Sequence, residues 1–233
     1  MKKAVLYINL GTPDSPDKKS VGRYLRQFLM DPFVIDIPYF FRWVLVNLII
    51  APFRSKKSAH AYQQIWTQKG SPLLVNSQEL VSKLSAHLRA EEGWKCFLGM
   101  RYGKPSISEV ASKIVHEGFD RVYLVPAYPQ YALSSSETGF QQAEACFKEL
   151  GFGGPVYRLQ DYYQDPGFIR AVAENIRAVQ KSFKPDHILF SYHGLPKRHL
   201  TKLHPECEFQ RSCCEKVWAE SRNCYRHQSV MTT

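Results

Sequence analysis

Residues 4–14 read AVLYINLGTPD, and this stretch decides the fold class. The run from Val5 to Leu10 is apolar and rich in strand formers, and residues 11–16 then supply the Gly and Pro chemistry of a loop. Because the run is apolar throughout, both faces of this strand are expected to be buried, which is typical of a parallel sheet. The loop lacks a G-x-G-x-x-G pattern, so it does not predict a dinucleotide site.

Four more strands are expected further along the chain, each reached through a helix. The strands are predicted at residues 95–102, 121–127, 156–159 and 187–192. Helices are predicted at about residues 20–29, 74–92, 107–117, 134–150 and 166–183. Strands that alternate with single helices imply parallel βαβ units. The sequence therefore predicts an α/β fold in which parallel sheets are flanked by helices.

Two Rossmann-like domains are expected. Residues 1–162 hold four of the predicted strands and should form a first α/β domain. Residues 163–233 should begin a second α/β domain, which looks incomplete because the chain stops soon after one strand. In doubly wound sheets ligands bind outside the carboxyl ends of the strands, so the segments that follow the strands are the candidates for a site.

Composition narrows the range of partners. The chain has 233 residues, a net charge of +10 and an apolar share of 44%, which is ordinary for a globular protein. Its Lys and Arg residues form no long run, which argues against nucleic acid and favours a carboxylated substrate or a membrane surface. Met1 leads almost directly into the first strand rather than into a signal peptide, so we expect a cytoplasmic protein.

The aromatic and apolar segment of residues 38–54 has two interpretations. Its most apolar part, residues 43–53, is shorter than the roughly 20 residues that span a bilayer. Cations at Arg42 and Arg54 would suit peripheral contact with a membrane surface. Its length favours instead a core helix that frames a cleft.

Chemically active side chains follow three of the predicted strands. Arg101 and Tyr102 end the second strand, where an arginine can clamp a carboxylate or simply lie at the surface. Tyr128 and Tyr131 follow the third strand and could face a flat aromatic ligand. His193 follows the fifth strand, where an imidazole suits metal ligation and proton acceptance, although a lone histidine is often structural.

Four of the six cysteines lie within residues 207–224, at Cys207, Cys213, Cys214 and Cys224. In a reducing compartment such crowding favours zinc or an iron–sulfur cluster over disulfides. The spacing is not that of a zinc ribbon, and adjacent cysteines can reach different irons of a two-iron cluster more easily than one tetrahedral ion. Four reduced thiols without metal are the alternative.

Taken in chain order, these segments resemble the ferrochelatase family. The resemblance rests on residues 9–13, 62–66 with 70–73, 100–103, 129–131 and 191–196. Any one segment is a weak indication, but the set in order covers the whole chain and is specific. The cysteine-rich tail is similar to that of bacterial members which bind a [2Fe–2S] cluster through an internal segment.

The resemblance implies an enzyme that inserts Fe²⁺ into protoporphyrin IX or coproporphyrin III to form haem. It implies that His193 accepts a pyrrole proton or delivers the iron. It also implies a set of porphyrin-binding side chains, namely Leu10, Ser71, Arg101, Tyr102, Tyr128 and Tyr131. The cluster ligands would be Cys207, Cys213, Cys214 and Cys224.

The chain departs from the family in length. Members continue beyond it, and the part that follows carries a glutamate opposite the active-site histidine. Two alternatives therefore stay open beside a ferrochelatase. One is an inactive fragment that only binds porphyrin or a cluster, and the other is a chelatase for a different tetrapyrrole.

Overall fold

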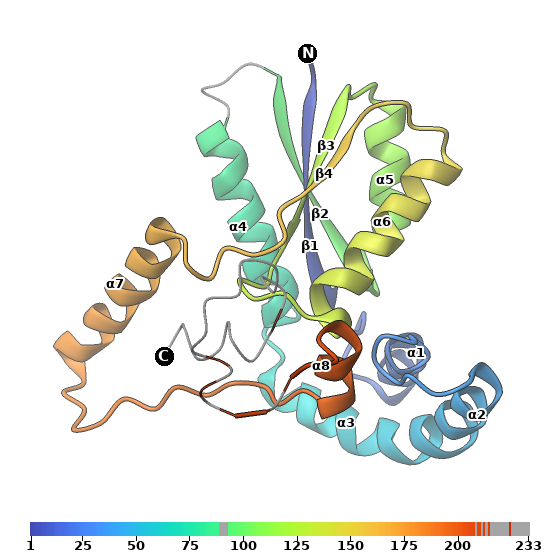
Figure 1. The fold of residues 1–233 in the computed structure, drawn as a ribbon. Coiled ribbons are helices and arrows are strands. Elements are labelled where there is room, and N and C mark those ends of the chain that lie inside the picture. The colour runs from blue at the N-terminus through green and yellow to red at the C-terminus, as the bar shows by residue number, and fades with distance from the viewer. Residues whose placement is uncertain (89–92, 208, 211, 213, 215–223, 225–233) are drawn as a thin grey trace. The chain divides into compact units, whose positions relative to one another are not determined.

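The computed structural model describes residues 1–88, 93–207, 209, 210, 212, 214 and 224 (Figure 1). The chain divides into two compact units. The first is formed by Met1–Ala127 with Leu133–Leu159, and the second by Tyr128–Ala132 with Gln160–Thr233. The predicted domain boundary after residue 162 stays a prediction.

Four strands of the first unit form a parallel sheet in the order β2-β1-β3-β4 (Figure 1). They are β1 (Lys3–Gly11), β2 (Trp94–Tyr102), β3 (Arg121–Pro126) and β4 (Val156–Arg158). The α/β fold class and the first four predicted strands are thereby confirmed. Because β2 lies on one side of β1 and β3 on the other, the winding direction reverses there, and ligands bind outside the carboxyl ends of strands at such a point.

Helices of the first unit cover both faces of this sheet and extend beyond its carboxyl edge. Figure 1 shows α4 on one face and α5 with α6 on the other. The helices are α1 (Lys18–Leu29), α2 (Tyr39–Val44), the π-helix η1 (Leu45–Ile50), α3 (Ala51–Ile65), α4 (Pro72–Leu88), α5 (Ile107–His116), the π-helix η2 (Leu133–Glu137) and α6 (Thr138–Glu149).

Alternation along β1 sorts its side chains between two apolar cores. Leu6 and Ile8 pack with side chains of α5 and α6, including the fully buried Ile114. Val5 and Tyr7 pack on the opposite face against side chains that include Val81 of α4. The continuous apolar run of this strand is therefore explained by burial on both faces.

Residues 38–54 do not form the expected core helix. They belong to the helical run of α2, η1 and α3, whose large apolar side chains mostly face solvent, with Phe40 and Phe53 at 69% and 78% exposure. We call this set the α2–α3 apolar surface, formed by Tyr39, Phe40, Phe41, Trp43, Leu48, Ile49 and Phe53. Hydropathy alone could not separate a buried helix from an exposed apolar one.

Residues 187–192 form no strand, so the fifth predicted strand is wrong. The second unit contains α7 (Pro166–Ser182) and α8 (Lys197–Leu203), and its described residues include no strand with which this segment could pair. A strand is held by hydrogen bonds to a neighbour. Apolar side chains alone did not create one, and Leu189 is 92% exposed.

We expect Leu124→Ala to lower the free energy of unfolding by about 2–5 kcal/mol, because the fully buried Leu124 side chain fills the core between β3 and α6. Leu80→Ala removes the same atoms from a side chain of α4 that is 46% exposed, and should change stability by less than about 1 kcal/mol. Urea unfolding followed by circular dichroism would measure both. Equal effects would contradict the packing described here.

Candidate functional site

The carboxyl edge of the sheet brings together two side chains that are about 90 residues apart in the sequence. The register pairs Gly11 with Tyr102, and one residue earlier on each strand it places Leu10 beside Arg101. Alternation puts both side chains on the face of the sheet that carries α5 and α6. Two of the predicted porphyrin-binding residues therefore lie next to each other at the ends of β1 and β2.

The ends of these two strands approach so closely that glycine is required. Gly11 has a φ of +104°, and a Cβ atom built there would lie 1.6 Å from the carbonyl oxygen of Tyr102. No other residue type could occupy this position without moving the backbone. The Gly that ends the first strand thus fixes how the loop after β1 sits on the end of β2.

Asp31, which sequence reasoning missed, joins this edge to the neighbouring helices. Its side chain is 1% exposed, and its Oδ2 accepts hydrogen bonds from Arg101 Nη2 at 2.5 Å, Tyr102 OH at 2.8 Å and Thr138 Oγ1 at 2.5 Å. Its Oδ1 accepts the backbone N–H of Phe33 at 2.7 Å. One carboxylate therefore links the end of α1, the end of β2 and the start of α6.

Nothing in the local sequence marks Asp31, which simply follows an amphipathic helix. The one available pointer was Arg101, because a cation at the end of a buried strand needs a partner when it loses solvent. The burial of Arg101 therefore predicts an acidic partner, but it does not indicate which of the 21 acidic residues is that partner.

Arg101 is held by contacts on two sides, and part of its side chain remains exposed to solvent. Its Nε donates to Thr138 Oγ1 at 2.7 Å, and its guanidinium lies over the Tyr102 ring at 4.7 Å from the ring centroid. The Arg101 side chain is 19% exposed, whereas the Asp31 side chain beneath it is almost completely buried. The arginine is thus anchored from inside and accessible from outside.

Tyr102 is fully buried, so it does not meet solvent directly. Burial raises the pKa of the Tyr102 hydroxyl well above its ordinary value, and the adjacent Asp31 carboxylate raises that pKa further. The phenol therefore stays protonated and donates to Asp31. Its place in the site is behind Arg101.

Ser71 lies in a second layer of polar contacts. It is 4% exposed, and its Oγ accepts a hydrogen bond from Thr12 Oγ1 at 2.9 Å. Nearby, Asn9 Nδ2 donates to Ser77 Oγ at 2.9 Å, which ties the end of β1 to α4. Because Ser71 accepts this hydrogen bond, its own hydroxyl group can still donate one to another acceptor.

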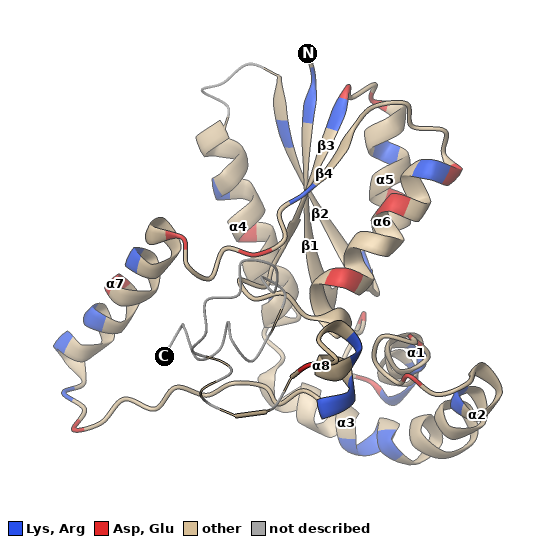
Figure 2. Cartoon of the chain, in the orientation of Figure 1, with Lys and Arg blue, Asp and Glu red and all other residues tan. Residues whose placement is uncertain are grey.

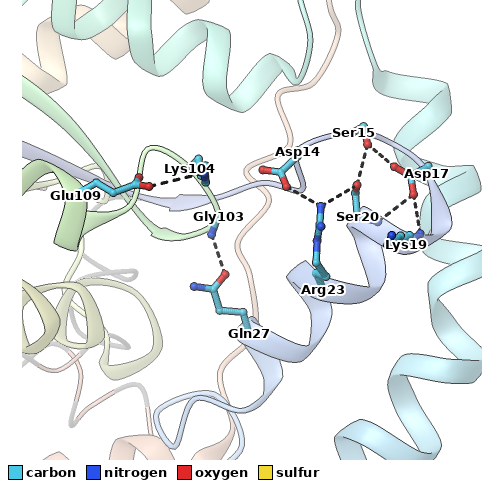
Figure 3. Close-up of polar contacts among 10 residues, drawn as sticks. All are labelled: Asp14, Ser15, Asp17, Lys19, Ser20, Arg23, Gln27, Gly103, Lys104 and Glu109. Atoms are coloured by element: carbon cyan, nitrogen blue, oxygen red, sulfur yellow. Dashed lines mark hydrogen bonds and ion pairs between the residues drawn. The ribbon is translucent and has the colours of Figure 1, made fainter.

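A pocket of about 440 Å³ lies beyond these strand ends, between the loops after β1 and β2 and helix α1, and several charged side chains line it (Figure 3). Its cations are matched by acids: Arg23 contacts Asp14 at 2.9 Å and Lys104 contacts Glu109 at 3.7 Å. Asp17 caps α1 by accepting from the backbone N–H groups of residues 19 and 20. These pairings make the pocket a structural junction of the first unit.

The second unit holds the other predicted site residues. His193 is exposed in a segment that forms neither helix nor strand, Tyr131 is buried, and Tyr128 is partly buried. The neighbouring Tyr192 helps to line an apolar pocket of about 290 Å³ together with side chains of α7. His193 thus follows directly on a pocket residue of its own unit.

Comparison with known proteins decides the family. The family model for ferrochelatase matches residues 2–232 of this chain. The chain belongs to the ferrochelatase family. A protein named ferrochelatase from Coxiella burnetii strain Dugway 5J108-111 is 40% identical over 236 residues, which cover 100% of this chain and 64% of that protein.

Two further ferrochelatases show the same relation in length. The protein from Legionella pneumophila strain Paris is 39% identical and matched over 68% of its length, and the protein from Opitutus terrae is 42% identical and matched over 67%. The chain spans about two thirds of the length of the curated ferrochelatases it matches.

The cysteines of this ferrochelatase-family chain are only partly described. Cys213 lies outside the described residues, Cys214 is buried, and Cys207 and Cys224 are partly exposed. Within the described part of the chain, no three His, Cys, Asp or Glu side chains gather closely enough to hold a metal ion. The described cysteines therefore do not by themselves present a cluster site.

Among the residues with described positions, no helix combines the length and hydropathy that crossing a membrane requires.

We expect Asp17→Asn to destabilise the chain more at pH 6 than at pH 3. A hydrogen bond from Ser15, followed by those from residue 20, holds the pKa of the Asp17 carboxyl well below its ordinary value. A depressed folded-state pKa adds stability above the unfolded-state pKa of about 3.9, and this stability is lost as the pH falls towards the folded-state value. Urea unfolding at both pH values measures the difference. A difference that does not change with pH would contradict the cap described here.

Proposed function

We propose that this chain supplies the porphyrin-binding and proton-accepting part of a ferrochelatase, which inserts Fe²⁺ into protoporphyrin IX or coproporphyrin III to form haem. The observation that carries the proposal is the family match over residues 2–232. The cluster of Leu10, Arg101 and Asp31 at the carboxyl edge supports it, since ligands of such sheets bind at that edge.

The reaction requires two protons to leave the porphyrin. Fe²⁺ replaces the two pyrrole N–H protons, so the products are the Fe²⁺ porphyrin and two H⁺. The nitrogen lone pairs of a flat macrocycle lie in the ring plane, and bending the ring turns them towards the metal. Contacts with remote parts of the ring can supply the energy for this distortion.

We assign the proton acceptor to His193. Neutral imidazole accepts a proton near pH 7, and it can also ligate Fe²⁺ on its way to the ring. The side chain is exposed in the segment after Tyr192, so a substrate could reach it. The proton that His193 accepts can then pass to solvent. Its imidazole nitrogen is thereby free to accept a proton in the next turnover.

The remaining site residues receive roles that follow from their positions and contacts. Arg101 is the natural partner of a porphyrin carboxylate because it is both anchored and accessible. Leu10 beside it would contact the apolar ring, and Tyr102 would act by supporting Arg101. Ser71 would donate a hydrogen bond from its hydroxyl group to a carboxylate.

Tyr128 and Tyr131, which belong to the second unit, would contact the aromatic ring of the porphyrin. We propose a first α/β domain over residues 1–162 and the start of a second α/β domain over residues 163–233. In this division Tyr128 and Tyr131 lie in the first domain, between β3 and η2, and His193 is contributed by the second domain.

We expect His193→Ala to lower the rate of Fe²⁺ insertion at least about a hundredfold while leaving porphyrin affinity and the unfolding midpoint unchanged. His187→Ala is a matched control, because His187 is an exposed histidine six residues earlier in the same segment. Anaerobic absorbance assays with protoporphyrin IX and Fe²⁺ measure turnover. Near-normal turnover in His193→Ala would remove the central assignment.

We also propose a [2Fe–2S] cluster on Cys207, Cys213, Cys214 and Cys224. The crowding of four thiols within residues 207–224 supports it, since thiolates are the usual ligands of such clusters. No step of metal insertion is assigned to the cluster.

Anaerobically purified protein should therefore contain iron and acid-labile sulfide and absorb visible light, and Cys207→Ser or Cys224→Ser should abolish both properties. Cys146→Ser is the control, because Cys146 packs against the core of the first unit. Purified protein without bound iron and sulfide would refute the cluster.

A peripheral contact with a membrane is proposed for the α2–α3 apolar surface. The cations Arg54, Lys56 and Lys57 follow this segment directly in the sequence of α3, a helix on which Figure 2 shows basic residues in blue. Apolar side chains beside lysine and arginine suit the interface of a bilayer that contains anionic lipid. A membrane is also a sensible source of an apolar porphyrin.

Flotation with vesicles that contain an anionic lipid should carry the chain upward, and Phe40→Ser with Phe41→Ser should reduce the floated fraction severalfold. Leu150→Ser is the control, because Leu150 is 41% exposed and lies outside this surface. Flotation that does not depend on lipid would contradict the proposal.

A further inference from the structure

We propose that Asp31 is a positioning residue which, together with Thr138, fixes the Arg101 guanidinium so that its remaining edge faces a carboxylate of the substrate. The inference rests on the proposed function, because the carboxylate in question is a porphyrin propionate. It adds to that function a residue that never touches the substrate but determines how well a carboxylated tetrapyrrole is recognised.

The hydrogen bonds of Arg101 leave one nitrogen for a ligand. Nη2 donates to Asp31 and Nε donates to Thr138. Nη1 makes no hydrogen bond to any residue in the part of the chain that the structure describes, and the side chain retains 19% exposure. The protein therefore uses two of the three nitrogens and leaves the third at the accessible side.

The two anchors also bind each other. Thr138 Oγ1 accepts from Arg101 Nε and donates to Asp31 Oδ2, so the three side chains form a closed ring of hydrogen bonds. Tyr102 completes the arrangement, because its hydroxyl donates to the same carboxylate oxygen and its ring lies under the guanidinium. The plane and the direction of the guanidinium are both fixed.

A guanidinium that is fixed in this way binds a ligand at a lower entropic cost. A free arginine loses rotamer freedom when it grips a ligand, whereas an arginine that is already ordered does not. The exposed edge can then meet a carboxylate with little further ordering, and the hydrogen bond it makes is charge-assisted. The benefit should be specific to ligands that carry a carboxylate.

The alternative is that Asp31 only stabilises the fold, since it joins the end of α1 to β2 and α6. The two roles differ in what they predict for a neutral ligand. Loss of a purely structural contact should weaken binding of every porphyrin alike. Loss of a positioning contact should weaken binding of the acid and spare its ester.

The test compares dissociation constants for protoporphyrin IX and for its dimethyl ester, measured by porphyrin fluorescence with the complete 233-residue chain. The unsubstituted chain should prefer the free acid about tenfold, as expected for one charge-assisted hydrogen bond. Asp31→Asn should bring this preference close to one without changing affinity for the ester. Arg101→Met should do the same, and the double variant should show no further loss.

Two more variants complete the design. Thr138→Val keeps the shape of the side chain and should reduce the preference about threefold, which keeps the idea testable if Asp31→Asn fails to fold. Asp120→Asn is the matched control, since Asp120 lies at the opposite edge of the same sheet and contacts Lys2. It should retain the full preference.

The outcomes separate this inference from the function on which it rests. Binding of neither porphyrin by the unsubstituted chain would overturn the proposed function and the role of Asp31 with it. Tight binding of the acid with an unchanged preference in the Asp31 and Thr138 variants would overturn the role of Asp31 alone. An equal loss of acid and ester binding in those variants would assign Asp31 to the fold.

Discussion

Hydrogen bonding of β1 to a parallel neighbour on each side is the constraint on which the rest of the first unit depends. It buries both faces of the strand, which explains the unbroken apolar run that begins the chain. It also brings the ends of β1, β2 and β3 to one edge of the sheet. The contacts of Arg101 form at that edge, where Asp31 after α1, Tyr102 at the end of β2 and Thr138 at the start of α6 come together.

Asp31 fixes the side chains at this edge of the sheet relative to one another. A carboxylate that is removed from water must be paired and hydrogen-bonded, and Asp31 meets both needs through Arg101, Tyr102 and Thr138. The same contacts leave Arg101 partly exposed above its buried partner. The hydrogen bonds of Asp31 thus offset the cost of burying its charge. The same hydrogen bonds hold the charged guanidinium of Arg101 in place for a ligand.

The sequence predicted the four strands of the first unit because their apolar runs, turn residues and helical spacing all agreed. It also placed Leu10 and Arg101 at strand ends, and the register makes them neighbours. It did not reveal Asp31, since side-chain pairing between distant segments has no local pattern. It failed at residues 187–192, where apolar composition suggested a strand but strand formation depends on a partner that composition cannot supply.

The most direct test of the account is hydrogen–deuterium exchange of the chain with and without protoporphyrin IX. The account predicts that porphyrin slows exchange of backbone amides at the carboxyl edge, in residues 10–13 and 100–103, and around residues 191–195 of the second unit. It predicts no change at the amino edge of the sheet, in residues 2–4 and 119–121. Protection at the amino edge, with the carboxyl edge unaffected, would contradict it.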